Sequence, residues 1–147
     1  MTTARSAQEV ATRAAEAMWA GDAASQALGI ELVRVAPGRA TVRMTVREDM
    51  VNGHAIGHGG LTFTLADSAF AFACNSYNRS TVAAHCEIRF LAPTRLGDVL
   101  VASAVERSRK DRDGVYDVTV HVGDTLVADF VGHSKEVRGV LFTDEAS

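Results

Sequence analysis

The sequence predicts an α+β fold in which one curved antiparallel sheet of six strands wraps around a long central helix. Residues 59–75 are apolar on all sides, as in a buried helix, and six runs with the composition of strands surround them in the chain. No other helical segment is apolar enough to cover such a sheet. We expect one domain over residues 1–147, with a helical segment at about 6–28 and a core at about 30–135.

The first predicted helix covers residues 6–20, which are rich in Ala and Glu with apolar positions at helical spacing. Ser6 stands three residues before Glu9, which is the spacing of an N-cap. Gly21 ends this helix, and residues 23–28 form a further short turn.

A β-hairpin is predicted next, because the β-branched run at 30–36 and the alternating run at 39–46 flank the turn dipeptide Pro37-Gly38. The alternation directs four side chains of the second strand to the core: Ala40, Val42, Met44 and Val46.

Four more strands are predicted after the long helix, at residues 82–90, 99–108, 115–122 and 125–132, and the last two form a hairpin. In the first of these strands, alternation separates two sets of side chains: Val82, Ala84, Cys86, Ile88 and Phe90 on one face, and His85, Glu87 and Arg89 on the other.

Charge and hydropathy exclude several function classes. The net charge of −3 gives no attraction to nucleic acid or to an anionic membrane. No apolar run reaches the roughly 18 residues that span a bilayer, and the N-terminus lacks the apolar region of a secretory signal, so we expect a cytoplasmic protein. Cys74 and Cys86 are too few and too far apart for a zinc clip or a disulfide scaffold, and we interpret both as free thiols.

The strings NGHAIGHGGLTFTLADSAFAFACN and EIRFLAPTRLGD resemble the hotdog-fold acyl-CoA thioesterases, most closely the phenylacetate-degradation (PaaI) type, over roughly residues 15–135. The resemblance implies an enzyme that hydrolyses an acyl-CoA thioester, with arylacetyl-CoA such as phenylacetyl-CoA or a hydroxylated derivative favoured over medium-chain acyl groups. It also implies a homodimer, often paired further into a tetramer. No cofactor is expected, because coenzyme A is part of the substrate.

Gly59 and Gly60 stand at the predicted start of the long helix, where backbone N–H groups lack intrahelical partners and the helix dipole is positive. Such an end can stabilise an oxyanion, and the resemblance implies that the N–H of Gly59 polarises the thioester carbonyl. The alternative is that the two glycines only form a tight turn into the helix.

Asp67 is the one acid in this apolar helix. It follows Gly59 by eight residues, about 12 Å along the axis, which is too far to act on a carbonyl bound at the start of its own helix. Two antiparallel helices would bring Gly59 of one subunit to Asp67 of the other, so we expect an obligate dimer with Asp67 as nucleophile or general base. Alternatively, Asp67 only caps or pairs with another group on the inner surface.

Other candidate site residues stand near Gly59 and Asp67 in the sequence. Asn52 could orient a water or a carboxylate, and His58 could contact the thioester or fix its loop; His54 is a weaker candidate. The spacing of His54 and His58 lacks a third metal ligand, so no metal is expected. Some relatives carry a helper hydroxyl on the strand after the helix, where this chain has Val82, Ala83 and Ala84, which leaves Thr64 or Ser68 for that role.

The coenzyme A phosphates require cations, and the acyl group requires apolar walls. The cationic candidates are Arg89, Arg95, Arg109 and Lys110, and the predicted walls are Leu61, Phe63 and Phe70. Two other functions stay open: an acyl-CoA binding or sensing module without catalysis, and an enoyl-CoA hydratase, although the chain lacks a D-x-N-P-x-H-like string.

Overall fold

A computed structural model describes residues 4–144 of the chain, and within them it contains three α-helices, six strands and one short 3-10 helix. Their order along the chain is α1 (Ala7–Gly21), α2 (Ala23–Ala27), β1 (Glu31–Ala36), β2 (Arg39–Thr45), the 3-10 helix (Glu48–Met50), α3 (Gly59–Cys74), β3 (Thr81–Phe90), β4 (Val99–Lys110), β5 (Asp113–Val122) and β6 (Thr125–Glu136).

The first helix begins where the sequence predicts. The Ser6 hydroxyl accepts a hydrogen bond from the Glu9 N–H at 3.1 Å, so Ser6 is the N-cap of α1. Asp22 then caps α2 by accepting from the Ser25 N–H at 3.0 Å. Trp19 of α1 packs near Phe72 of α3, with ring centroids 6.5 Å apart, and this contact joins the N-terminal segment to the core.

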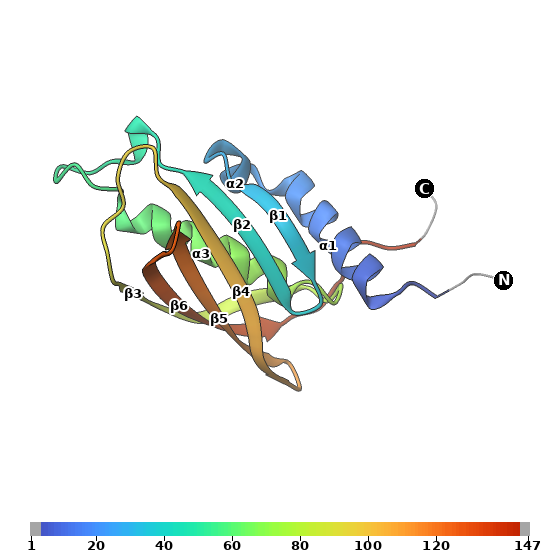
Figure 1. Ribbon diagram of the computed structural model, residues 1–147. Coiled ribbons are helices and arrows are strands. Elements are labelled where there is room, and N and C mark those ends of the chain that lie inside the picture. Colours follow the sequence, from blue (N-terminus) through green and yellow to red (C-terminus); the bar gives the residue numbers. More distant parts are fainter. Residues whose placement is uncertain (1–3, 145–147) are drawn as a thin grey trace.

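The six strands form one antiparallel sheet in the order β1-β2-β4-β5-β6-β3, which confirms the predicted architecture. The predicted hairpin of β1 and β2 is present, and its four predicted core residues are all buried: Ala40, Val42, Met44 and Val46. Figure 1 shows α3 lying across the concave face of this sheet, with α1 beside β1. Because β3 is last in the order, its outer edge has no neighbour in the described part of the chain.

The core lies between α3 and the sheet. Phe70 of α3 is 1% exposed and packs against Phe130 and Tyr116, with centroids 5.9 and 5.7 Å away. A Cβ on Gly132 of β6 would lie 2.7 Å from the Phe70 ring, so glycine makes room for this helix. The predicted strand end at Gly132 is wrong, because β6 continues to Glu136 through pairing with β3 and β5.

A β-bulge interrupts the pairing of β3 with β6 between Ala83 and His85. Beyond the bulge, Cys86 and Ile88 pack against the core as predicted. Before it, Val82 pairs with Lys135 and is 49% exposed. The prediction that Val82 shares a face with Cys86 is therefore wrong, because one extra residue shifts the alternation.

Neither cysteine forms a disulfide: Cys74 is buried and Cys86 is half-buried. No helix in residues 4–144 combines the length and the apolar composition needed to cross a membrane.

Candidate active site

The N-terminus of α3 is capped by a histidine side chain. His58 is the N-cap, and its Nδ1 accepts a hydrogen bond from the Gly60 N–H at 3.0 Å. An accepting Nδ1 places the imidazole proton on Nε2, which belongs to an exposed side chain. Of the two roles open for His58 in the sequence, fixing the loop is the one this hydrogen bond performs.

The cap leaves one glycine N–H available. The N–H groups of Leu61 and Thr62 both donate to the His58 carbonyl, at 3.0 and 3.4 Å. In residues 4–144 the Gly59 N–H has no acceptor. Since no acid stands in the first turn of α3, the positive end of the helix dipole is not neutralised there. A ligand oxygen at Gly59 would therefore meet a free donor in a favourable field.

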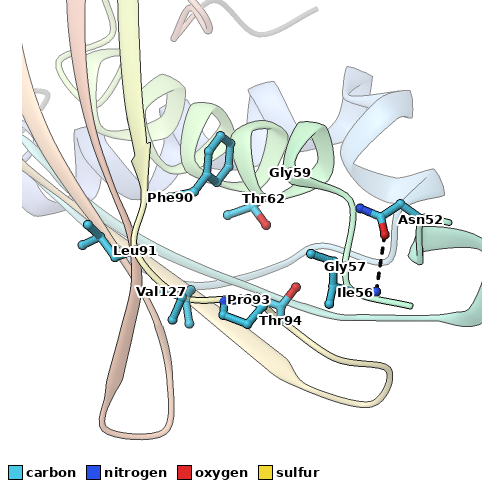
Figure 2. A pocket seen from close by; sticks show the side chains of 11 residues that line it. Asn52, Ile56, Gly57, Gly59, Thr62, Phe90, Leu91, Pro93, Thr94 and Val127 are labelled. Carbon is cyan, nitrogen blue, oxygen red and sulfur yellow. Dashed lines mark hydrogen bonds between the residues drawn. The ribbon is translucent and has the colours of Figure 1, made fainter. Parts of the chain in front are cut away.

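A cavity of about 290 Å³ opens beside Gly59. It lies between the start of α3, the loop before it and the segment after β3 (Figure 2). Its lining consists of Asn52, Ile56, Gly57, Gly59, Thr62, Phe90, Leu91, Ala92, Pro93, Thr94 and Val127.

Asn52 contributes its amide nitrogen to this cavity. The Asn52 Oδ1 accepts from the backbone N–H groups of His54 and Ile56, at 2.9 and 3.4 Å, and these contacts fix the amide orientation. Figure 2 shows the nitrogen turned toward Gly59. The Nδ2 group has no acceptor within the described residues, so it can donate to a bound ligand.

Asp67 lies away from the cavity, eight residues further along α3, which is about 12 Å along the helix axis. Its side chain is half-buried, and the part of the chain that the structure describes offers its carboxylate neither a hydrogen bond nor an ion pair. Burial raises the pKa of Asp67 above its ordinary value. Burial, and then the nearby charge of Asp67, raises the pKa of Cys86 on β3 to about 11.

Asp67 belongs to a stripe along α3 that the sheet does not bury. Its members follow one another at spacings of four, three and four residues, as on one helix face: Gly60, Thr64, Asp67 and Ala71. The stripe lies next to the unpaired edge strand β3, so one exposed surface combines a helix face with a free strand edge.

The thioesterase superfamily model matches residues 54–128, which include the start of α3, Asp67 and the cavity segment after β3. The acyl-coenzyme A thioesterase PaaI of Escherichia coli is 45% identical over 133 residues, covering 90% of this chain and 94% of that protein.

The chain belongs to the thioesterase superfamily.

Two solved structures of similar proteins support this family assignment. The structure of the E. coli PaaI protein from the phenylacetic acid degradation operon superimposes with a TM-score of 0.90 at 43% identity, covering 92% of this chain and 99% of that one. A mutant of the phenylacetic acid degradation protein PaaI from Thermus thermophilus has a TM-score of 0.75 at 37% identity, covering 77% and 97% of the two chains. The predicted resemblance to hotdog-fold thioesterases of the PaaI type is confirmed.

In this thioesterase the two candidate helper hydroxyls already donate within the chain. The Thr64 hydroxyl donates to the Gly60 carbonyl at 2.9 Å. The Ser25 hydroxyl is 2.7 Å from an Asp22 carboxylate oxygen and 3.1 Å from the Ser68 hydroxyl. Because the ionised Asp22 only accepts, Ser25 donates to it, and Ser68 donates to Ser25. Thr64 and Ser68 can therefore still accept a hydrogen bond, but their own O–H groups already donate within the chain.

The four predicted cations of the thioesterase are dispersed. Arg89 pairs with Asp129 at 2.6 Å on the outer face of the sheet, and Arg109 lies 3.5 Å from the Tyr77 ring beyond the other end of α3. Lys110 is exposed at the end of β4. Only Arg95 directly follows a residue that lines the cavity, Thr94.

The predicted apolar walls turn toward the core instead of the cavity. Phe63 packs edge-on against Phe130 with centroids 5.3 Å apart, and Phe70 is buried. Leu61 is half-buried and packs against the core. His54 and His58 belong to no group of three or more potential metal ligands in residues 4–144.

Sequence reasoning found Asn52 and Gly59 but missed other residues that line the cavity of the thioesterase. Phe90 was assigned only to a strand face, yet its ring would lie 3.1 Å from a Cβ on Gly59. Thr62 and Thr94 were not singled out. The available signal was a pair of threonines in otherwise apolar segments, LTF and APT.

Proposed function

We propose that this chain hydrolyses acyl-CoA thioesters as a homodimer, with each active site made from Gly59 of one subunit and Asp67 of the other. The proposal rests chiefly on one observation: the free N–H at the start of α3 and the partnerless carboxylate on the same helix stand too far apart to act on one carbonyl.

A two-fold axis perpendicular to α3 would bring Gly59 of one subunit close to Asp67 of the other. It would set two α3 helices antiparallel through their exposed stripes, and would bring the two β3 edges together. This arrangement covers an unpaired strand edge, which is unfavourable to leave exposed. It also offers the Asp67 carboxylate a ligand and the loop of the partner, so a half-buried charge gains polar neighbours.

The chemistry then divides between the two subunits. The thioester carbonyl oxygen accepts from the Gly59 N–H, and the dipole of α3 stabilises the negative charge that develops on this oxygen. Asp67 of the partner subunit removes a proton from a water that attacks the carbonyl carbon, or attacks that carbon itself to give an anhydride that water cleaves. The C–S bond breaks, and the coenzyme A thiolate leaves and takes up a proton. Asn52 donates from Nδ2 to the water or to the partner carboxylate.

Arylacetyl-CoA is the substrate class that we favour. The cavity walls include the Phe90 ring and the side chains of Leu91 and Val127, which suit a flat apolar group. The similarity to proteins named for phenylacetic acid degradation points the same way. Arg95 is the cation best placed for the coenzyme A phosphates, and pairing of two dimers into a tetramer remains part of the proposal.

The first test replaces Asp67 with Asn and measures thiol release from phenylacetyl-CoA. We expect kcat to fall by roughly 10² to 10⁴ with the fold retained, as for loss of a general base or nucleophile. A binding module without catalysis would show acyl-CoA-dependent thermal stabilisation and no thiol release by the wild type. Turnover by the variant at the wild-type rate would exclude Asp67 from the chemistry.

The second test asks whether the site is shared. Subunits carrying Asp67→Asn and subunits carrying Gly59→Val are unfolded together, refolded as a mixture and assayed. A mixed dimer contains one complete site, so activity should return to about a quarter of the wild-type value with random pairing. Each variant refolded alone is the control. If the mixture is no more active than the two controls, the acid and the glycine act within one subunit.

A further inference from the structure

Two histidines lie opposite each other on the outer face of the sheet, away from α3. His85 of β3 and His133 of β6 are partners in the antiparallel register. Their neighbours in the chain face the other way, since Cys86 packs against the core and a Cβ on Gly132 would lie 2.7 Å from the Phe70 ring of α3. Figure 1 shows β3 and β6 at this edge of the sheet. The histidine pair, His85 and His133, is therefore separate from the candidate active site.

The β-bulge in β3 brings this pair together. Before the bulge Ala83 is the partner of Ser134, so an uninterrupted register would next set Ala84 opposite His133. The extra residue instead places His85 there. Bulges of this kind re-aim a side chain, and here the result is two imidazoles on one face of adjacent strands.

Both imidazoles are available to a ligand. Their ring centroids are 5.5 Å apart, and the planes meet edge to face at 63°. Throughout residues 4–144, neither ring takes part in a hydrogen bond or an ion pair, in contrast to His58, whose Nδ1 accepts the Gly60 N–H. His85 is exposed and His133 is half-buried, so an ion in solution can reach both. A neutral imidazole keeps one unprotonated ring nitrogen that can bind a metal.

The separation of the rings fits one shared metal ion. Two imidazoles that bind zinc tetrahedrally, with Zn–N distances of about 2.1 Å, have ring centres roughly 5 Å apart. The observed 5.5 Å is within a small side-chain rotation of that value. Imidazole nitrogen suits Zn²⁺, Ni²⁺ and Cu²⁺, whereas Mg²⁺ and Ca²⁺ prefer oxygen. Because no third His, Cys, Asp or Glu in residues 4–144 joins the pair, water must complete the coordination, as in an exchangeable site.

The charges around the pair favour a cation. Two cationic side chains on this face are already matched by acids of β5: Lys135 pairs with Asp113 at 3.1 Å, and Arg107 pairs with Asp117. Glu87 follows His85 by two residues on the same face, and the described part of the chain gives it no ion pair, although its charge raises the pKa of Arg107. Two cations and three carboxylates leave a net charge of −1 around the two neutral rings.

We propose that the histidine pair binds a divalent transition-metal ion of the Zn²⁺ class and thereby cross-links β3 to β6. In the described part of the chain β6 is the only strand that pairs with β3, so a ligand shared by the two strands holds the edge of the sheet. A metal that binds only the folded pair stabilises the fold by mass action. The inference does not depend on the proposed function.

Calorimetric titration with Zn²⁺ tests the site. The protein carries no affinity tag and is first treated with a chelator, and we expect one Zn²⁺ per chain and no binding of Mg²⁺. His85→Gln and His133→Gln should each weaken Zn²⁺ binding by roughly tenfold or more, because each removes one of two protein ligands. His121→Gln, which removes a histidine of β5 outside the pair, is the matched control and should bind as the wild type does. No binding by the wild type up to about 0.5 mM Zn²⁺, or unchanged binding in either pair variant, would overturn the proposal.

Cu²⁺ reports the ligands directly. Electron paramagnetic resonance of Cu²⁺ bound to the wild type should show coupling to two imidazole nitrogens, and each pair variant should show one at most. Coupling to two imidazoles that persists in a pair variant would place the metal elsewhere and contradict the assignment. Melting of the metal-free proteins is the folding control, and the variants should melt close to the wild type because the rings make no hydrogen bond within the fold.

Hydrogen exchange tests the cross-link itself. Saturating Zn²⁺ should slow exchange of the β3 and β6 amides around the pair in the wild type and in His121→Gln, and should leave exchange unchanged in the two pair variants. The melting temperature of the wild type should rise by roughly 5 °C at a free Zn²⁺ concentration about 100 times its Kd. Zn²⁺ binding that alters neither exchange nor melting would refute the cross-link.

Discussion

His58 Nδ1 accepts the Gly60 N–H at 3.0 Å, and this contact decides which N–H at the start of α3 is left for a ligand. The neighbouring donors at Leu61 and Thr62 turn to the His58 carbonyl, so the N–H of Gly59 is the one that faces the cavity without an acceptor. One side chain thus caps the helix end and leaves the Gly59 N–H as the donor that the proposed reaction needs for the thioester oxygen.

Replacing His58 with Ala should therefore weaken both the fold and the reaction. Loss of an N-cap costs about 1 kcal/mol of the free energy of unfolding. His58→Asn is the informative comparison, because Asn is also a good N-cap, and it should restore most of the stability and activity lost in His58→Ala. Chemical denaturation and thiol release measure the two effects. An Asn variant as unstable as the Ala variant would show that the cap is unimportant.

Gly59→Ala should impair the reaction more than the fold. The new methyl group would lie 3.1 Å from the ring of Phe90, which lines the same cavity as Gly59. We expect kcat/KM to fall by roughly tenfold or more, since an oxyanion-hole donor contributes about 10²- to 10³-fold. Gly21→Ala is the control, because no atom lies within 4 Å of a Cβ there. Recovery of activity in a Gly59→Ala, Phe90→Ala double variant would identify the ring as the obstacle, and wild-type activity in Gly59→Ala alone would contradict the assigned role.

Asp67 should make the stability of the protein depend on pH. Its pKa is raised by burial, so the folded chain binds a proton that the unfolded chain has already released. Its contribution therefore falls as pH rises from the unfolded pKa to the folded pKa, and above both the charged group destabilises the fold. Asp67→Asn removes that charge.

The variant should accordingly melt at a higher temperature than the wild type near pH 7, with the difference shrinking toward about pH 4. Differential scanning calorimetry over this range measures the effect, and Asp124→Asn in the exposed β5-β6 turn is the control. The same raised pKa predicts that activity declines as pH falls through it, because the base or nucleophile must be ionised. A pH-independent difference between variant and wild type would contradict this account.

Gly57→Ala should destabilise the loop before α3. A methyl group there would lie 2.0 Å from the Thr94 Oγ1 and 3.3 Å from its Cβ, so the two segments must separate or Thr94 must rotate. Overpacking of this kind costs about 1 to 3 kcal/mol. In a Thr94→Ala background the cost should be clearly smaller, and a double-mutant cycle on the free energy of unfolding measures the coupling. Equal costs in both backgrounds would show that the two residues are not coupled.

Patterns of local sequence predicted most of the architecture. The all-apolar run of α3, the alternation in β2 and the cap at Ser6 depend on neighbours in the chain, and each is present as expected. The extension of β6 beyond Gly132 and the bulge in β3 were not predicted. They depend on the pairing of β6 with β3 and β5 and on the register between β3 and β6, which no local pattern contains.

The residues of the candidate site also fall into two groups, those that the sequence predicts and those that only the fold brings together. Gly59 and Asp67 stand out in the sequence because each is unusual for its surroundings, and the helix rise alone gives the separation between them. Thr62 and Thr94 are ordinary residues until the fold places their hydroxyls across one cavity. The distribution of the predicted cations could not be foreseen either, since Arg89 finds its acid on another strand.

The choice of an imidazole at position 58 has an electrostatic consequence. Aspartate caps helices at least as well, but its full negative charge would lie next to the point where the substrate oxygen becomes anionic, and the two charges would repel. An imidazole that accepts the Gly60 N–H on Nδ1 adds no negative charge, so the positive field at the end of α3 stays available to an anionic ligand group. A histidine cap therefore fits the proposed role of this helix end better than an aspartate cap would.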